Sequence, residues 1–526
     1  MARLFRRRLG AAMRSFSCLM YLRGFHMRLG TCAVILLVAA SLLPTLLVDI
    51  PAMADYLNHL ARMYVLTDAG TPNENPYYEI TFVLYPNLAM DLIVPQLARF
   101  MEVESATRFF FFGSQVLIVT GAIAIEWTIK GRQEIAALAA LLALQTMPFS
   151  YGFTNFEFGL GVALFGIASW IACEHYKWHV RLATHALFVV VLFLAHFFAL
   201  GVYGLVVGLY ELRRMFVDRF DPGRATATVM MLAGPVLVMM VILYQTGGAI
   251  GATGNEWAFG WKPLWFALSL NGYNVMLSAG SMVTLLVLLG YLSITGGLEL
   301  SGAGKWIGVG FLIAFIAIPF KLFGARMADI RVIPAALLIL PAFLSVRPAK
   351  QRISGIVVST LVVLNAGYAA YVWLSYRSDY AEMKASFALL QPSSFVLVGD
   401  SRTGEVSSTL FTDAPMYRAP TLAVHYAKAF VSSLYTIPGA EPIEVRPDLK
   451  HLDVSTATES YTLPSLTTLR ALAQGQDVPD APHYLQNWKR DFQYVYLLGE
   501  NTENALPGVL DELARYRRFT LYIVRK

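Results

Sequence analysis

Four polar side chains recur at helical spacing just after the first hydrophobic segment of this sequence. They are a carboxylate, an amide, an imidazole and a guanidinium, at Asp55, Asn58, His59 and Arg62. Residues three or four positions apart lie on one face of a helix, and these groups together can accept a proton and bind an anion. Asp49 adds a carboxylate where the apolar run ends, a position at which charge is costly and usually functional. The stretch is a candidate site, although an interfacial helix with its polar face in water has the same pattern.

A second candidate is the basic segment K-L-F-G-A-R-M-A-D-I-R at residues 321–331. It contains three cations, Lys321, Arg326 and Arg331, and one acidic residue, Asp329. Arginine binds phosphate oxygens in a bidentate way and lysine supplies a point charge, so the segment predicts the capture of a phosphate or diphosphate. The alternative is that these cations only reach toward lipid headgroups. We expect Asp329 to orient Arg326 or Arg331 rather than to act in chemistry.

Three more polar residues interrupt apolar sequence. His196 separates two apolar runs in F-L-A-H-F-F-A-L, and Asn155 and Glu157 lie in the turn Y-G-F-T-N-F-E-F-G at residues 151–159. His196 could contact a phosphate, and Glu157 is a candidate second carboxylate. Each also has a structural interpretation, since a lone His among aromatics is often a satisfied core residue and Glu157 could stabilise a helix N-terminus.

Membrane-spanning helices must position these residues. Of the 526 residues 56% are hydrophobic and 14% charged, and the mean hydropathy is +0.54, whereas roughly 25% charged residues are usual in a soluble domain. Apolar segments long enough to cross a bilayer recur throughout residues 29–375 and predict about eleven spans. They lie near residues 29–48, 108–128, 134–149, 157–173, 182–196, 197–212, 226–245, 279–296, 305–320, 332–346 and 353–375.

Charge and composition suggest how the chain is oriented. The basic N-terminus, residues 1–28, predicts a cytoplasmic start, and the acidic first loop, residues 50–106, an outer one. Residues 376–526 are mixed in composition and predict a small α/β domain on the outer face. This domain has strand-like runs at residues 394–398, 492–498 and 519–524, and a helical stretch near residues 506–516. The net charge of +6 comes from short loops between apolar runs, so we expect no nucleic-acid partner.

These features resemble the GT-C superfamily of membrane glycosyltransferases, which take sugars from polyprenyl-phosphate carriers. The shared features are the basic N-terminus, the first outer loop that opens with Asp49 and Asp55, and the turn at residues 151–159. The basic segment before a late span and the C-terminal outer domain are shared as well. The D-Y-L-N-H-L-A-R segment is particularly similar to poorly characterised bacterial members.

The resemblance implies that Asp55 is the general base or orients the acceptor, with Asp49 as the alternative. The lipid phosphate would leave toward Lys321, Arg326, Arg331 or His196, with inversion at the sugar. His59, Arg62 and Asn155 would bind substrate or orient Asp55. This sequence has D-Y at residues 55–56 where the superfamily usually has an acidic pair, so metal dependence stays open. Asp55, Glu157 and His59 are the candidate ligands for a Mg²⁺ or Mn²⁺ ion.

The resemblance also implies a multi-pass protein of the bacterial inner membrane, with its N-terminus cytoplasmic and its C-terminus periplasmic. The donor would be a polyprenyl-phosphate-linked sugar, and the acceptor a lipid, a glycan or a protein. Two alternatives remain open: a transporter or flippase for lipid-linked glycans, and a non-catalytic protein that binds them. Transporters often contain inverted repeats with broken helices in matching halves, and none is visible in this sequence.

Overall fold

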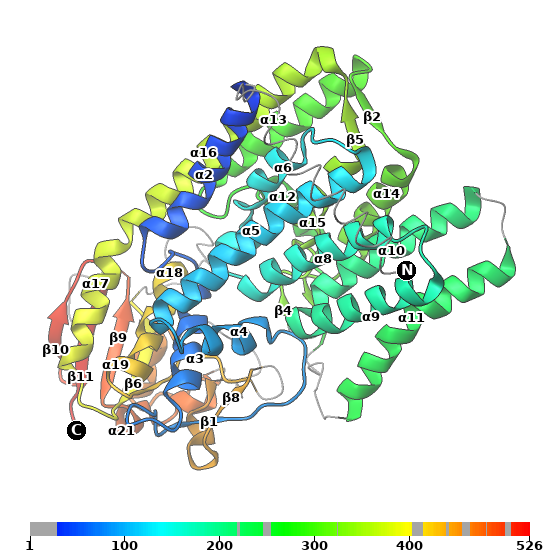
Figure 1. The fold of residues 1–526 in the computed structure, drawn as a ribbon. Helices are drawn as coiled ribbons and strands as arrows, with labels where there is room; N and C mark the ends of the chain where they lie inside the picture. Colours follow the sequence, from blue (N-terminus) through cyan, green and yellow to red (C-terminus); the bar gives the residue numbers. More distant parts are fainter. Residues whose placement is uncertain are drawn as a thin grey trace.

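A bundle of apolar helices forms most of the molecule, and a small β-sheet domain forms its C-terminal end (Figure 1). The predicted basic N-terminus, residues 1–28, lies outside the described residues. The computed structural model describes residues 29–217, 221–245, 254–322, 325–401, 414–437, 441–454, 463–479, 481–499 and 506–526.

Most of the apolar segments predicted as spans are helical, but residues 134–149 contain two short helices and residues 332–346 end in the short strand β5 (Leu344–Val346). Within the described residues, six helices are long and apolar enough to cross a membrane, so the predicted count of about eleven spans is not confirmed. These six are α5 (Val103–Lys130), α8 (Thr154–Ala172), α9 (Trp178–Ala195), α11 (Pro222–Gln245), α13 (Val275–Ile294) and α16 (Pro348–Ser375), which continues into α17 (Arg377–Ser386). The other apolar helices include α2 (Leu29–Leu47), α6 (Ala136–Ala143), α10 (Phe197–Val217), α14 (Gly302–Ala317) and α15 (Val332–Ile339).

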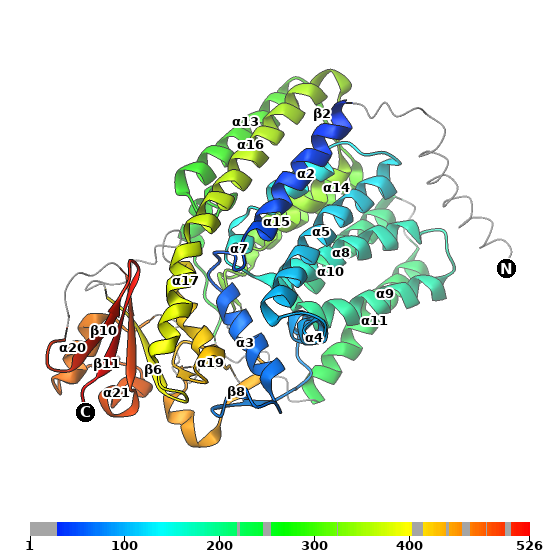
Figure 2. The same cartoon turned by 60° about the vertical axis from the view of Figure 1, so that its left-hand side comes forward.

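The C-terminal domain contains a five-stranded sheet in the order β10-β11-β9-β6-β7. Strand β6 is parallel to β7 and β9, whereas β11 is antiparallel to β9 and β10. The three strand-like runs of the sequence are confirmed as β6, β9 and β11. The bounds are β6 (Phe395–Asp400), β7 (Phe430–Val431), β9 (Tyr494–Leu498), β10 (Leu510–Arg515) and β11 (Phe519–Val524). Figure 2 shows α17 leading from the bundle to this sheet.

The helix predicted near residues 506–516 is wrong. Residues Leu510–Arg515 form strand β10, which pairs with β11 from Leu510 opposite Val524 to Arg515 opposite Thr520. The segment L-D-E-L-A-R contains good helix formers, but β11 follows within a few residues and offers an unpaired edge. Pairing with that edge outweighs the local propensity, and the charged side chains of β10 suit an exposed edge strand.

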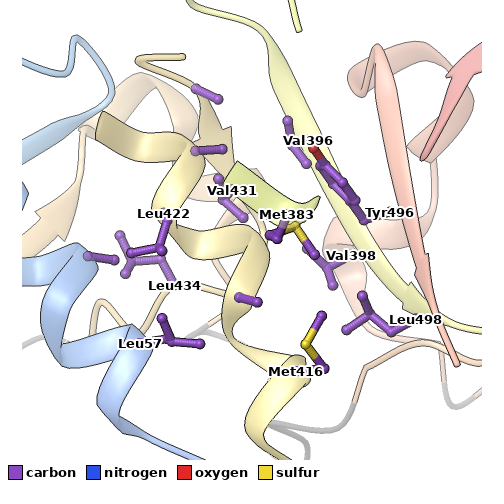
Figure 3. Packing of buried hydrophobic residues seen from close by; sticks show 14 of the residues in the cluster. Leu57, Met383, Val396, Val398, Met416, Leu422, Val431, Leu434, Tyr496 and Leu498 are labelled. Carbon is purple, nitrogen blue, oxygen red and sulfur yellow. The ribbon is translucent and has the colours of Figure 1, made fainter. Parts of the chain in front are cut away.

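The first loop, residues 50–106, packs against the C-terminal domain. Its strand β1 (Tyr78–Ile80) pairs antiparallel with β8 (Ile443–Val445). Its helix α3 (Tyr56–Asp68) lies against the turn Ala419–Leu422, and Figure 3 shows Leu57 of α3 beside Leu422 and Leu434 in one buried apolar cluster. Loop and domain therefore share a hydrophobic core.

Polar contacts strengthen this packing. The Asn75 side chain donates hydrogen bonds to the carbonyls of Val424 and Ala429, over 2.9 and 3.0 Å. His425 of the C-terminal domain lies 2.6 Å from the carboxylate of Asp68, at the end of α3. The loop is thus held to the C-terminal domain at the end of α3 and again at Asn75.

Candidate functional site

A cavity of about 570 Å³ lies where the first loop, the helix bundle and the C-terminal domain meet. Six of the side chains singled out in the sequence line it, although they come from four separate segments of the chain. They are Asp55, His59, Asn155, His196, Arg326 and Arg331. The cavity therefore brings together the polar face that begins at Asp55 and the cations of the basic segment.

Asp55 occupies the N-cap position of α3, but its carboxylate makes no capping hydrogen bond to the helix. Its backbone N–H donates instead to the Tyr151 carbonyl over 2.8 Å, which ties α3 to the turn before α8. Gly152 is needed in that turn, because its φ of +88° is left-handed and a Cβ there would lie 3.1 Å from the Tyr56 nitrogen. The turn holds the backbone of Asp55 and leaves the carboxylate facing the cavity.

The electrostatics of the cavity favour a base that works near neutral pH. Burial raises the pKa of Asp55 from its usual 3.8 to about 6, although Arg418, Arg331 and Arg62 act to lower it. Burial likewise lowers the pKa of His59 well below its usual value, and the charge of Arg62 lowers it further. At pH 7 the site therefore contains an ionised Asp55 beside a neutral imidazole, and a carboxylate with a pKa near 6 can accept a proton in a reaction.

Arg331 is a buried cation near the charge of Asp55, but it has no carboxylate in direct contact among the described residues. It is 7% exposed, and among the described residues no carboxylate lies within 4 Å of its guanidinium. The guanidinium stacks 4.4 Å from the ring centroid of Phe153, and its Nε has no hydrogen-bond partner in the described part of the chain. A buried charge is stable only when it is paired or solvated. An anion bound in the cavity would supply the missing partner.

The prediction for Asp329 is wrong: it orients neither Arg326 nor Arg331. Its carboxylate pairs with the buried Lys262 at 2.8 Å, and Lys262 also donates to the carbonyls of Phe315 and Ile318, over 2.7 and 2.8 Å. The lysine thus closes the C-terminal end of α14, where backbone carbonyls lack helical partners. Asp329 therefore anchors the basic segment through Lys262 and does not pair with the cations Arg326 and Arg331.

Two of the predicted acidic residues and one cation lie away from the cavity. The Asp49 side chain is 74% exposed and contacts Arg108 at 3.2 Å. Glu157 is buried in α8, does not line the cavity, and both of its carboxylate oxygens lack partners among the described residues. Lys321 is opposite Arg326 in the short antiparallel ladder of β3 (Lys321–Leu322) and β4 (Ala325–Arg326), and it does not line the cavity either.

The candidate metal ligands do not come together. Glu157 lies outside the cavity that Asp55 and His59 line. In the part of the chain that the structure describes, no three His, Cys, Asp or Glu side chains are close enough to hold a metal ion. The grouping of Asp55, Glu157 and His59 expected from the sequence therefore does not form.

Arg62 binds protein groups. It is fully buried and donates two hydrogen bonds to Asp91, over 2.7 and 3.3 Å, and one to Glu441. Its neighbour on the same helix face, Asn58, accepts a hydrogen bond from the Tyr435 backbone over 2.9 Å. Both residues therefore anchor α3, to the first loop through Asp91 and to the C-terminal domain through Glu441 and Tyr435.

Asn155 has a similar structural role at the cavity wall. Its carbonyl oxygen accepts from the Met90 backbone and its amide donates to the Asn87 carbonyl, each over 2.8 Å. Asn87 also lines the cavity and has a left-handed φ of 93°. Asn155 thus stabilises an unusual turn of the first loop beside the site.

Sequence reasoning missed the wall that the C-terminal domain contributes. Tyr435, Ile437 and Glu441 line the cavity, and burial raises the pKa of Glu441 to about 7 although Arg62 acts to lower it. Nothing in the local sequence marks Glu441, because it is one acidic residue in a polar domain. Its partner Arg62 is 379 positions away.

Fold and cavity define a multi-pass membrane protein with a mixed acidic and basic site between its helix bundle and a sheet domain. No family model matches the chain, and no curated protein matches it in sequence. Among solved structures it is similar to ArnT from Cupriavidus metallidurans bound to undecaprenyl phosphate, with 13% identity and a TM-score of 0.49 over 93% of this chain and 97% of that one. For ArnT in the apo state the identity is 14% and the TM-score 0.47, over 94% and 98% of the two chains.

Proposed function

We propose that this protein is a glycosyltransferase that moves a sugar from a polyprenyl-phosphate carrier to a lipid, glycan or protein acceptor. The reaction takes place at the outer face of the bacterial inner membrane, with the N-terminus cytoplasmic and the C-terminal domain periplasmic. One observation carries the proposal: Asp55, whose pKa is near 6, lines the same cavity as Arg331, a buried cation with no carboxylate in direct contact among the described residues. Transfer from a lipid phosphate needs both a proton acceptor and a group that stabilises the departing anion.

The proposed reaction is a direct displacement. The acceptor hydroxyl attacks the anomeric carbon, its proton passes to Asp55, and the bond between that carbon and the phosphate oxygen breaks. The bonding electrons leave with the phosphate, whose growing negative charge is stabilised by Arg331 and Arg326. Attack from the side opposite the leaving group inverts the anomeric carbon. His196 lines the same cavity and is a further hydrogen-bonding group for the phosphate.

The two lysines of this region, Lys321 and Lys262, do not line the cavity and act on the phosphate only indirectly. Lys321 is opposite Arg326 in the β3–β4 ladder and adds positive charge beside that cavity-lining arginine. Lys262 and Asp329 hold the segment in which Arg331 stands. We assign no metal ion a role, since the acidic residues of the cavity do not form a ligand set.

The test uses the full-length protein in nanodiscs with a panel of radiolabelled undecaprenyl-phosphate sugars and a bacterial membrane extract as the source of acceptor. Asp55→Asn is expected to lower transfer by about 100-fold or more and to retain binding of undecaprenyl phosphate. Asp49→Asn is the matched control, because Asp49 is exposed and outside the cavity, and it is expected to leave transfer unchanged.

Three results contradict the proposal in different ways. Full transfer by Asp55→Asn excludes Asp55 as the base. Movement of the lipid-linked sugar across a proteoliposome membrane without a new glycosidic bond indicates a transporter. Binding of the lipid without transfer by the unmodified protein, for every sugar of the panel, indicates a non-catalytic binding protein.

A further inference from the structure

Glu441 is an acidic residue of the C-terminal domain that faces the cavity and has no part in the displacement described above. It lies two residues before β8, the strand that pairs with β1 of the first loop. Arg62 donates a hydrogen bond to its Oε2 atom. In the described part of the chain, its other oxygen, Oε1, has no hydrogen-bond partner and is not sealed from the cavity.

Its partner holds this carboxylate in place. The Arg62 guanidinium is fully buried and is fixed from the other side by Asp91. The side chain of Glu441 is 11% exposed, so its rotation is restricted as well. By contrast, the Asp55 carboxylate makes no capping hydrogen bond to α3. Glu441 is thus the carboxylate of the cavity that is arranged to hold a ligand group through one free oxygen.

The charges of the cavity indicate which part of a ligand meets Glu441. The cations Arg326 and Arg331 come from β4 and the start of α15, and the carboxylates Asp55 and Glu441 come from α3 and the C-terminal domain. A phosphate drawn to the cations presents its attached sugar to the rest of the cavity. Above its pKa of about 7, Glu441 is ionised, so that its oxygen is a strong acceptor for hydroxyl groups and cannot donate to a phosphate.

We propose that Glu441 binds hydroxyl groups of the sugar on the lipid phosphate, so that the C-terminal domain supplies part of the donor site. This inference rests on the proposed function, because it takes the ligand to be a polyprenyl-phosphate sugar. Glu441 is then a binding residue that determines which sugars are accepted, and Arg62 and Asp91 are its positioning residues. The domain is a component of the site and not only a cover for it.

The experiment compares two probes on the full-length protein in nanodiscs: undecaprenyl phosphate, and a panel of undecaprenyl-phosphate hexoses and pentoses. Glu441→Gln is the test variant, because it removes the charge while Arg62 keeps Asp91 as its partner. Glu444→Gln is the matched control, since Glu444 lies in β8, contacts Lys450 and Thr81, and does not line the cavity. Glu441→Asp keeps the charge near Arg62 on a shorter side chain and is the second variant.

For the unmodified protein we expect at least one sugar-bearing lipid to bind about tenfold or more tightly than undecaprenyl phosphate, as a charged hydrogen bond allows. Glu441→Gln is expected to lose this difference and to keep its affinity for undecaprenyl phosphate. Glu441→Asp should bind the same sugar-bearing lipid more weakly than the unmodified protein, and Glu444→Gln should match the unmodified protein.

A Glu441→Gln variant that retains the preference for the sugar-bearing lipid overturns the inference, and so does an unmodified protein with no such preference. A Glu441→Gln variant that loses undecaprenyl phosphate as well also overturns it, because the carboxylate then supports the whole cavity. If the unmodified protein binds neither lipid, the proposed function fails, and that result is distinct from the others.

Discussion

Replacing Asp55 by asparagine should make the protein more stable while it abolishes transfer. The folded protein raises the pKa of Asp55 from 3.8 to about 6 because burial disfavours the charged carboxylate. Each pKa unit corresponds to about 1.36 kcal/mol, so the ionised side chain costs the folded state about 3 kcal/mol at pH 7.5. Water in the cavity screens part of this cost, and the value is therefore an upper limit.

The dependence on pH has a defined sign. Between about pH 3.8 and pH 6 the folded state binds more protons at Asp55 than the unfolded state does. Its contribution to the free energy of unfolding therefore falls as the pH rises through this window and is constant above it. Asparagine does not titrate, so the gain from Asp55→Asn should be largest above pH 6 and nearly vanish at pH 4. The cap of α3 is unaffected, because Asp55 makes no capping bond.

The assay is denaturant unfolding of the detergent-solubilised protein at pH 4 and pH 7.5, for the unmodified protein, Asp55→Asn and Asp49→Asn. Asp49 is exposed, and its replacement should change the free energy of unfolding by less than about 0.5 kcal/mol at either pH. The reasoning is refuted if Asp55→Asn is less stable than the unmodified protein at pH 7.5. Equal gains at both pH values would also refute it, since the effect would then not come from ionisation.

Three further predictions concern the site and its supports. The kcat/KM for transfer should rise with pH through about 6, because the ionised fraction of Asp55 grows from about one tenth at pH 5 to about nine tenths at pH 7; a flat profile over this range would exclude Asp55 as the base. Arg62→Met should lower the free energy of unfolding by about 3–5 kcal/mol, because Asp91 remains buried without its partner, and adding Asp91→Leu should recover part of the loss in the same unfolding assay. Lys262→Met should weaken binding of undecaprenyl phosphate about tenfold, because it releases Asp329 and with it the segment that positions Arg331; an equilibrium binding measurement that shows no change would contradict this role.

Local pattern was enough to predict the helices and three of the strands. Apolar runs of membrane length became helices, and the β-branched and aromatic runs at β6, β9 and β11 became strands. The failure at Leu510–Arg515 has a specific cause. Its residues favour a helix in isolation. They form a strand because they pair with the edge of β11, and that pairing cannot be read from the residues of the segment itself.

In the site, sequence reasoning succeeded where the neighbours are close along the chain. The helical spacing from Asp55 to Arg62 correctly indicated a shared helix, and the basic segment was recognised from its own composition. The pairing of Asp329 with Lys262 was missed because the two residues are 67 positions apart. Glu441 was missed for the same reason, because its contact with Arg62 joins residues 379 positions apart and no short sequence pattern contains both.

The pairing of β1 with β8 has a consequence for how the protein is made. Residues 78 and 445 are partners in that ladder, and Asn58 and Tyr435 are joined across 377 positions. The first loop leaves the ribosome early, but its apolar face and the buried charge of Arg62 have no complete set of partners until the C-terminal domain has been synthesised. Contacts over such separations form late in folding. A chain that ends before β8 therefore lacks both the strand that pairs with β1 and the cavity wall formed by Tyr435, Ile437 and Glu441.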